Sequence, residues 1–217
     1  MQTAKKPKPR AADSNRFPAP DPKKPYVYPG TDVLINKFGI RNDMVLERVA
    51  ATVAGLRVEM LKSFQPLDGD FDLKHLRAIH RYLFQDVFPW AGQLRMVETV
   101  KGGQDFEAHT AIVPKARALF VQLREENFLQ GLDLEPFIER LVYYYAELNR
   151  IHVFRDGNGR AQRTFFELLA ARAEYHLDFA KATKRENNAA SHAAYAGDFE
   201  PLRAMFRDIV FKSATVC

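Results

Sequence analysis

The stretch RIHVFRDGNGRAQR, Arg150–Arg163, separates two strongly helical segments and gathers polar residues of several kinds. Before it, EPFIERLVYYYAELNRI (135–151) has apolar residues at every third or fourth position. After it, RTFFELLAARAEYH (163–176) has helical character again. The stretch therefore predicts a loop that ends one helix and starts the next, with the second helix beginning near Gly157 or Asn158.

Four further segments have apolar residues at helical spacing, and each predicts an amphipathic helix. They cover residues 42–63, 71–88, a stretch beginning at Pro114, and 199–211. We expect the recurring apolar residues to face a core rich in Phe and Tyr. In chain order they are Val45, Val49, Val53, Leu56 and Met60; Leu73, Leu76, Ile79, Leu83 and Val87; Ala118, Val121 and Leu123; and, before the loop, Phe137, Leu141, Tyr144, Leu148 and Ile151.

One segment lacks helical spacing. RMVETVKGGQDFEAHT (95–110) has β-forming residues on both sides of Gly102-Gly103, which predicts a hairpin from Met96 to Glu107. An isolated hairpin is only marginally stable, so this one must lean on the helices or grip a ligand. The predicted fold class is all-α, a helical bundle with a small β-hairpin flap.

The basic charge of the chain lies at its start. The 217 residues have a formal net charge of +5. Residues 1–24 hold seven basic and two acidic side chains and are rich in proline, so residues 25–217 balance at zero. We therefore expect a disordered basic tail over 1–24 and one domain over 25–217, with no direct nucleic-acid contact. The tail is either a solvated segment or an arm for an acidic partner.

The sequence favours a cytoplasmic protein away from the membrane. It contains no apolar run long enough for a transmembrane helix and no apolar segment behind the basic N-terminus of the kind a secretory signal has. Its one cysteine is Cys217, which excludes an internal disulfide and a cysteine metal site.

The glycines of the loop predict an anion site. Gly157, Asn158 and Gly159 lie at a helix N-terminus, where backbone N–H groups lack partners and the helix dipole favours negative charge. Arg160 and Arg163 share one face of that helix and can both reach the same anion. Two arginines indicate more than one phosphate.

The rest of the loop supplies a metal ligand and a base. Asp156 would repel a phosphate unless a cation such as Mg²⁺ joined them. His152, four residues earlier, can take a proton from an attacking hydroxyl, and Phe154 is expected to anchor the loop in the core. Together these residues predict magnesium-assisted transfer of a phosphoryl or nucleotidyl group to a hydroxyl. The alternative reading, an ordinary capped turn with a solvated arginine pair, leaves the order of these groups unexplained.

The segment HVFRDGNGRAQR (152–163) resembles the Fic signature, His-Pro-Phe-x-Asp/Glu-Gly-Asn-Gly-Arg-x-x-Arg, with Val153 in place of the usual proline. The resemblance covers roughly residues 25–210 and implies a Fic-type helical bundle that moves AMP from ATP to a Tyr, Thr or Ser hydroxyl of a protein. The roles it implies are as follows: base, His152; Mg²⁺ ligand, Asp156; anion hole, Gly157, Asn158 (on the α-phosphate) and Gly159; outer phosphates, Arg160 and Arg163; target-docking flap, Val97, Val100, Lys101 and Phe106.

The resemblance also leaves alternatives. Doc-type relatives, which are protein kinases, have Lys at the position of Gly159, so Gly159 favours AMP transfer. Some relatives carry an inhibitory Ser/Thr-x-x-x-Glu helix, whose Glu would pair with Arg163. No Ser or Thr here has Glu four residues on. We therefore expect a toxin held by a separate small antitoxin with that helix, with gyrase or topoisomerase IV subunits as possible targets.

Two other readings stay open. One is a host-directed effector acting on GTPases, which is less favoured because no secretion domain follows residue 217. The other is a catalytically silent binding module. Asn187 and Asn188 are candidates for the adenine pocket by position alone.

Overall fold

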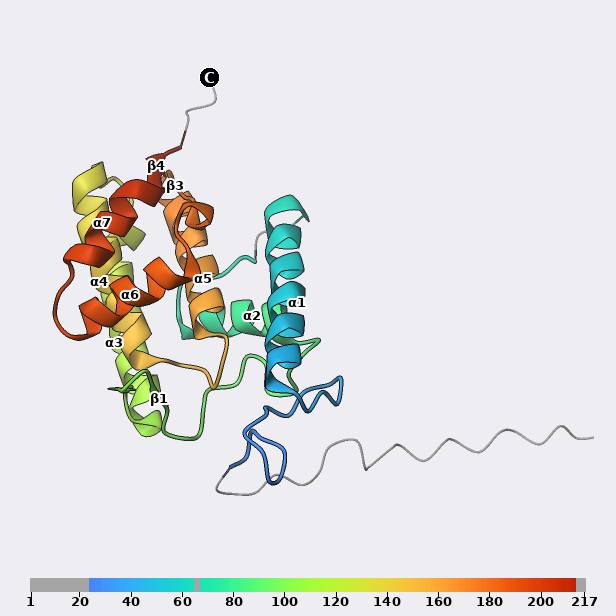
Figure 1. The fold of residues 1–217 in the computed structure, drawn as a ribbon. Helices are drawn as coiled ribbons and strands as arrows, with labels where there is room; N and C mark the ends of the chain where they lie inside the picture. Colours follow the sequence, from blue (N-terminus) through green and yellow to red (C-terminus); the bar gives the residue numbers. More distant parts are fainter. Residues whose placement is uncertain (1–23, 65–66, 214–217) are drawn as a thin grey trace, which may run out of the picture.

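The computed structural model describes residues 24–64 and 67–213, and this part is a helical bundle with two small two-stranded sheets (Figure 1). All of the predicted tail except Lys24 lies outside the described residues. The longer helices are α1 (Asp43–Phe64), α2 (Leu73–Phe84), α3 (Ile112–Glu125), α4 (Leu134–Ile151), α5 (Asn158–Arg172), α6 (Lys184–Tyr195) and α7 (Glu200–Ile209). Short 3-10 turns are η1 (His109–Ala111), η2 (Asn127–Leu129) and η3 (Phe179–Lys181). The all-α class is confirmed.

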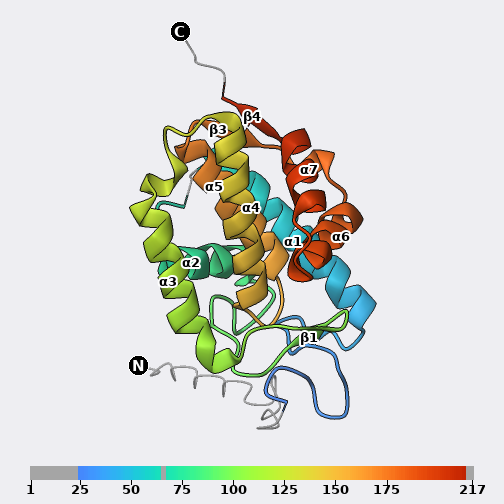
Figure 2. The same ribbon diagram turned by 90° about the vertical axis from the view of Figure 1, so that its left-hand side faces the viewer.

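Helix α5 lies at the centre of the bundle. It packs against α2, α4 and strand β3 (Tyr175–Leu177), and α4 packs in turn against α3, α6 and α7. Helix α1 contacts α2 and lies across α5 from α4 and α7 (Figures 1 and 2). The loop before α5 is thus reached from several elements at once.

The buried faces of α2 and α4 confirm the periodicity. Leu76, Ile79 and Leu83 are buried, Leu73 is half-buried, and all five recurring residues of α4 are buried. Helix α2 ends at Phe84, before the predicted end at residue 88, so Val87, which is also buried, lies in the turn after it. The core is aromatic-rich, as expected. Its fully buried aromatic side chains include Tyr28, Tyr144, Tyr145, Phe84, Phe88, Phe137, Phe154, Phe165, Phe166 and Phe206.

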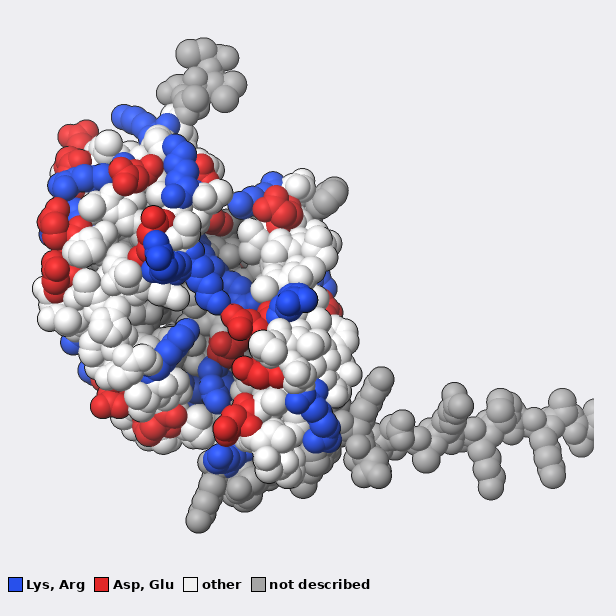
Figure 3. All heavy atoms as spheres, in the orientation of Figure 1, with Lys and Arg blue, Asp and Glu red and all other residues white. Residues whose placement is uncertain are grey.

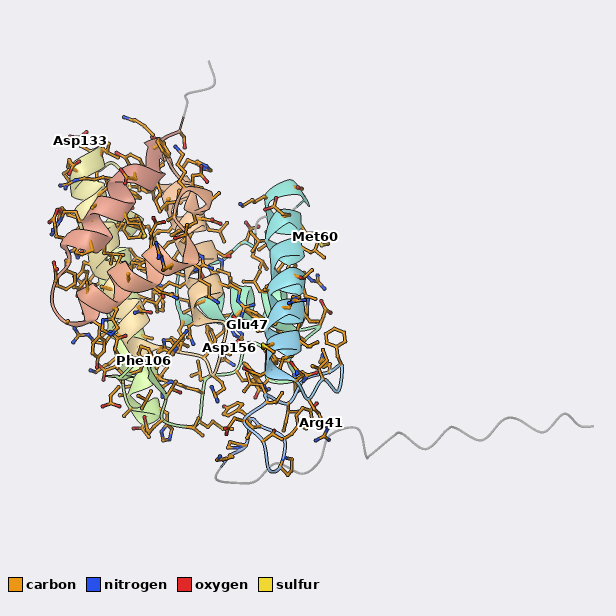
Figure 4. All side chains as sticks on the ribbon, in the orientation of Figure 1. Arg41, Glu47, Met60, Phe106, Asp133 and Asp156 are labelled. Atoms are coloured by element: carbon orange, nitrogen blue, oxygen red, sulfur yellow. The ribbon has the colours of Figure 1, made fainter. Side chains whose placement is uncertain are left out.

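The predicted face of α1 is wrong for three of its five residues, whereas Val49 and Val53 are half-buried. Val45, Leu56 and Met60 are 49%, 62% and 44% exposed, and Figure 4 shows Met60 on the side of α1 away from α5. The helix instead buries its other face, consisting of Leu46, Ala50, Ala54 and Leu61. Two alanines in that face let the helix backbone approach α2 closely, so the smaller residues face inward and the larger ones remain outside.

Part of the predicted face of α3 is also wrong. The helix begins two residues before Pro114, and Ala118 and Val121 are exposed, whereas Leu123 is buried as expected. The buried face consists of Ile112, Ala116, Leu119, Phe120 and Leu123. Long-range packing selects this face, because apolar residues lie on both sides of the helix.

Three elements were not predicted. Helix α6 has few large apolar residues, and its start is fixed by a capping box between Thr183 and Glu186. Strand β3 pairs antiparallel with β4 (Val210–Lys212). The helices expected over 163–176 and 199–211 therefore end earlier, at the bounds of α5 and α7.

The predicted hairpin is present, and its regular pairing is shorter than Met96–Glu107. Strand β1 (Val100–Lys101) pairs antiparallel with β2 (Gln104–Asp105). Gly102 and Gly103 both have positive φ, 59° and 78°, as a tight two-residue hairpin turn requires. None of the helices in the described part is long and apolar enough to span a bilayer.

Candidate active site

The loop before α5 is closed on itself by Asn158. Helix α4 ends at Ile151, and His152 follows in a left-handed conformation (φ 48°). The side-chain oxygen of Asn158 accepts a hydrogen bond from the Phe154 amide at 2.8 Å, and its amide nitrogen donates to the Phe154 carbonyl at 2.8 Å. Phe154 is buried in the core, as predicted. One N–H of the Asn158 amide remains for a ligand, so its predicted contact with the α-phosphate stays a prediction.

His80 of α2 supports the loop from beneath. Its Nδ1 accepts from the Gly92 amide at 2.8 Å, so Nε2 carries the hydrogen and donates to the Asp156 carbonyl at 2.9 Å. Its ring stacks on Phe154 with centroids 3.8 Å apart. Burial lowers the pKa of His80 to about 4, which keeps the ring neutral.

Gly157 follows from this packing. Its φ is +79°, and a Cβ there would lie 2.5 Å from the Phe84 ring. Only glycine satisfies both constraints. The close approach brings the start of α5 directly onto α2.

Arg95 joins the flap to the end of α4. Its buried side chain donates to the carbonyls of His152 (2.7 Å) and Ile151 (3.2 Å). It also donates to Val97 (2.8 Å) and Glu107, one on each leg of the flap. A single guanidinium thus fixes the general position of the flap relative to His152.

His152 is buried and unprotonated at neutral pH. Phe106 of the flap stacks flat on its ring, with centroids 3.6 Å apart and planes 9° apart. Burial, reinforced by the nearby charges of Lys101 and Arg95, lowers the pKa of His152 to about 3. Its Nδ1 has no hydrogen-bond partner within the described residues. The imidazole is therefore a free base beneath the flap.

The start of α5 is built for an anion. Across the described ranges, no side chain caps its first N–H groups, so these donors point into the site. Arg160 pairs with Asp156 (Nη2–Oδ2 3.3 Å) and lies over the Phe84 ring. The Nη1 atom of Arg160 is buried without a partner in the described part, and burial lowers the pKa of Arg160. An unpaired guanidinium N–H near a helix N-terminus is a strong hydrogen-bond donor to an anion.

Arg163 lies one turn further along the same face. It is half-buried and makes no ion pair with any described residue. A Cβ at Gly159 would lie 3.4 Å from the Nη1 of Arg163 and would meet no other described residue within 4 Å. Protein packing alone therefore does not demand glycine at 159. Figure 3 shows Lys and Arg side chains gathered in the hollow between α1 and the rest of the bundle.

A metal ion would depend on Asp156. Nowhere in residues 24–64 and 67–213 do three or more His, Cys, Asp or Glu side chains form a metal-binding group. Glu47 of α1 faces the same region (Figure 4), and Lys184 of α6 holds it at 2.8 Å and lowers its pKa. A lone carboxylate suits Mg²⁺ that keeps water and shares phosphate oxygens, and does not suit a metal bound by protein alone.

The free edge of the flap is strand β1. The Phe106 amide donates to the Thr99 carbonyl, and Lys101 pairs with Gln104, so the alternating pattern turns the Val100 amide and carbonyl outward. The other strand is covered, because Tyr195 of α6 donates to the Asp105 carbonyl at 2.6 Å. Figure 2 shows the flap beneath α6.

The structure places the predicted residues of the loop at the N-terminal end of α5 and Phe106 over His152. Val97, Val100 and Lys101 lie along the flap edge. Sequence reasoning missed His80, Arg95 and Glu47. His80 carried a weak signal, since it is a polar residue beside the buried stripe of α2. Arg95 and Glu47 carried none, because their partners are distant in sequence.

Comparison with known proteins identifies the family to which the chain belongs. Residues 70–170 match the model of the Fic/DOC family. The chain is 41% identical over 186 residues to a probable protein adenylyltransferase Fic of Escherichia coli K12, covering 86% of this chain and 92% of that protein. The chain belongs to the Fic/DOC family.

Other Fic-family relatives agree. Protein adenylyltransferase VbhT of Bartonella schoenbuchensis is 40% identical over 183 residues, which cover 84% of this chain and 38% of VbhT. The structure of BepC, a VirB-translocated effector of Bartonella tribocorum with bound AMPPNP, superposes with a TM-score of 0.80 at 28% identity, covering 87% of this chain and 97% of BepC. A Fic domain from Bartonella quintana with bound ADP superposes with the same score at 30% identity, covering 88% of this chain and 96% of that one. This Fic protein is therefore an enzyme of the nucleotidyltransferase class.

Proposed function

We propose that this Fic protein transfers AMP from ATP to a hydroxyl side chain of another protein. The observation that carries the proposal is one arrangement: an unprotonated His152 beside a helix N-terminus, with a guanidinium N–H of Arg160 buried and unpaired. The first group can accept a proton, and the second has a buried guanidinium N–H that no described residue accepts. The nucleotides bound by the structural relatives support ATP as the donor.

In the proposed reaction, His152 takes the proton of the target hydroxyl. The hydroxyl oxygen forms a bond to the α-phosphorus of ATP, and the bond from that phosphorus to the β-phosphate oxygen breaks, so pyrophosphate leaves. The backbone N–H groups of Gly157–Gly159 donate hydrogen bonds to the α-phosphate and stabilise the negative charge that develops on its oxygens. Arg160 and Arg163 hold the outer phosphates.

Asp156 is the residue that would hold Mg²⁺. The ion would neutralise phosphate charge when bound. Asp156 already carries the Arg160 contact at 3.3 Å, and its carbonyl is fixed by His80. The carboxylate is therefore oriented by the protein before any ligand arrives.

Gly159 favours AMP transfer over phosphorylation. The space that its missing side chain leaves opens toward Arg163, with no packing reason in the protein. A long side chain there would enter the phosphate site and change how the nucleotide lies. A Doc-type kinase remains the alternative, and transfer of label from the γ-phosphate of ATP would select it.

The target segment is proposed to add to the free edge of β1. Val100 turns a main-chain donor and acceptor outward, which an extended segment can pair with as an added strand. Phe106 lies over His152 on the same flap, so a docked hydroxyl is brought toward the base. This mode recognises main chain and explains why the flap bears no evident target motif.

We further propose that the enzyme is a cytoplasmic toxin restrained by a small antitoxin whose Ser/Thr-x-x-x-Glu helix reaches Arg163. Arg163 makes no ion pair with the described residues, as such a partner requires. Gyrase or topoisomerase IV subunits are the proposed targets. A second candidate is a host-directed effector, which the translocated Bartonella effectors among the structural relatives favour.

The test uses ATP labelled at either phosphate. Incubation with Mg²⁺ and bacterial lysate is expected to label a protein band from α-labelled ATP and not from γ-labelled ATP. His152→Ala should abolish the band, and His176→Ala, a matched change at an exposed histidine, should leave it. A band from γ-label alone selects the kinase. No band with either label, together with no ATP binding by calorimetry, selects the silent binding module.

A further inference from the structure

A cavity lies beside the free edge of the flap. It has a volume of about 280 Å³, and its walls come from three separate segments. The flap contributes residues 97–100, and the start of the domain contributes residues 24–27 and Asp32. The loop before α5 contributes Arg155. A segment docked on β1 would therefore run along the mouth of this cavity.

The acidic residues of the cavity are already paired. Asp32 accepts from Lys24 at 3.3 Å. Glu98 accepts from His109 at 2.6 Å and lies 3.6 Å from Arg95. Arg155 is half-buried and makes no ion pair with any residue the structure describes. The cavity thus offers one uncompensated charge, and that charge is positive.

The potential near His152 has the same sign. Lys101 at the flap tip is exposed and has no ion pair inside the described ranges. The charges of Lys101 and Arg155 both act to lower the pKa of His152. Two cations therefore flank the path that leads along β1 to the base.

A strand added at β1 presents its alternate side chains to opposite faces, so one set lies on the side of the cavity. From the cavity, its single free cation and this geometry, we propose that the enzyme selects target segments with an Asp or Glu near the acceptor hydroxyl, and that Arg155 binds this carboxylate. The inference rests on the proposed function, because it names the class of protein segment that the same site takes.

Arg155 is a specificity residue in this proposal and takes no part in the chemistry. It lies beside Asp156 in sequence, yet its side chain lines the cavity on the flap side. A charge-assisted pair in a partly buried cavity should change target affinity by roughly five- to tenfold. The turnover rate with saturating target should change little.

The experiment measures AMP transfer from α-labelled ATP to a peptide library. Each peptide carries one Tyr, Thr or Ser acceptor, with Asp, Glu, Ala or Lys placed at every flanking position. Wild type is expected to prefer Asp or Glu at one or two positions. Arg155→Ala should raise KM for those peptides roughly five- to tenfold at similar kcat, and Arg155→Glu should shift the preference toward Lys. Arg117→Ala, at an exposed arginine of α3, is the matched control and should behave as wild type.

Two results would overturn the inference separately from the proposed function. If wild type labels a protein in lysate and labels peptides without regard to flanking charge, the inference fails and the proposed function stands. The same holds if Arg155→Glu keeps the acidic preference. If wild type labels neither lysate protein nor peptide, both fail. Calorimetric ATP affinity, expected to be unchanged in Arg155→Glu, shows that the variant is folded.

Discussion

Among single residues, Phe106 is expected to keep the pKa of His152 low by covering its ring. The flap ring covers the imidazole and excludes water, and burial is the largest cause of its low pKa. Phe106→Ala should let water reach the ring and raise the pKa of His152 from about 3 toward its ordinary value. The measurement is an NMR pH titration of the histidine resonances, with Phe38→Ala, at an exposed phenylalanine, as the control. A pKa that stays near 3 would show that Phe106 does not cause the burial.

Arg160 is expected to lower the stability of the empty protein and to strengthen ATP binding. Its Nη1 is buried with no partner in the described part, an arrangement that costs free energy in the empty protein. Arg160→Met should keep or raise the free energy of unfolding and weaken ATP binding by roughly ten- to a hundredfold. Urea unfolding and calorimetry measure the two quantities. Lower stability with unchanged ATP affinity would contradict a role in phosphate binding.

Val153 is the one position of the loop that departs from the Fic signature. It is buried, its carbonyl accepts from the Arg95 amide at 3.0 Å, and no described residue accepts a hydrogen bond from its own amide. Val153→Pro therefore removes no hydrogen bond and should change kcat by less than about threefold. Steady-state kinetics of AMP transfer measure this. A large gain in rate would mean that the loop is less preorganised than its contacts indicate.

At the scale of elements, the flap and helix α4 are coupled through Arg95. The guanidinium holds both legs of the hairpin and the carbonyl of the base residue. Arg95→Lys keeps the charge but cannot make four directed contacts. It should lower kcat for AMP transfer and speed proteolysis within Val97–Glu107, with ATP affinity kept because the phosphate donors lie on α5. Equal loss of ATP affinity and kcat would instead indicate general unfolding of the site.

The helices differ in how well the sequence predicts their buried faces. Helices α2 and α4 have a single apolar stripe, and their buried faces follow it. Helix α1 has apolar residues on two faces, and the choice between them depends on the close approach that Ala50 and Ala54 permit. Pairing of β3 with β4 joins segments more than thirty residues apart, so no local pattern reveals it.

The residues of the site also fall into two groups, those that the sequence predicts and those that only the folded structure reveals. The residues of one loop, from His152 to Arg163, are predictable because the chain itself brings them together. His80, Arg95 and Glu47 reach that loop from other elements, and only the packing of α1, α2 and the flap places them there. Local sequence thus predicts the chemistry, and the tertiary structure supplies the groups that hold it in position.

At the scale of the whole molecule, buried histidines make stability depend on pH. The pKa of His80 is about 4 in the folded state, below its ordinary value of about 6.5, so between these values only the unfolded chain binds the proton. The free energy of unfolding should therefore fall as the pH drops from 6.5 toward 4, by up to about 1.4 kcal/mol per pH unit for this group. His152 acts in the same direction.

His80→Gln, which keeps a donor for the Asp156 carbonyl, should flatten this pH dependence even if it lowers stability overall. Urea unfolding at a series of pH values measures the slope. A slope equal to that of wild type would show that His80 is not the group that titrates.

In the proposed function, His152 activates a target hydroxyl for AMP transfer at the N-terminus of α5. Mass spectrometry of the modified target peptide tests it most directly. After incubation with ATP and Mg²⁺, wild type should leave an adenylyl group on a Tyr, Thr or Ser, and His152→Ala, still binding ATP with wild-type affinity, should leave none. A phosphoryl group in place of the adenylyl group would contradict AMP transfer, and adenylylation that persists in His152→Ala would show that His152 is not the base.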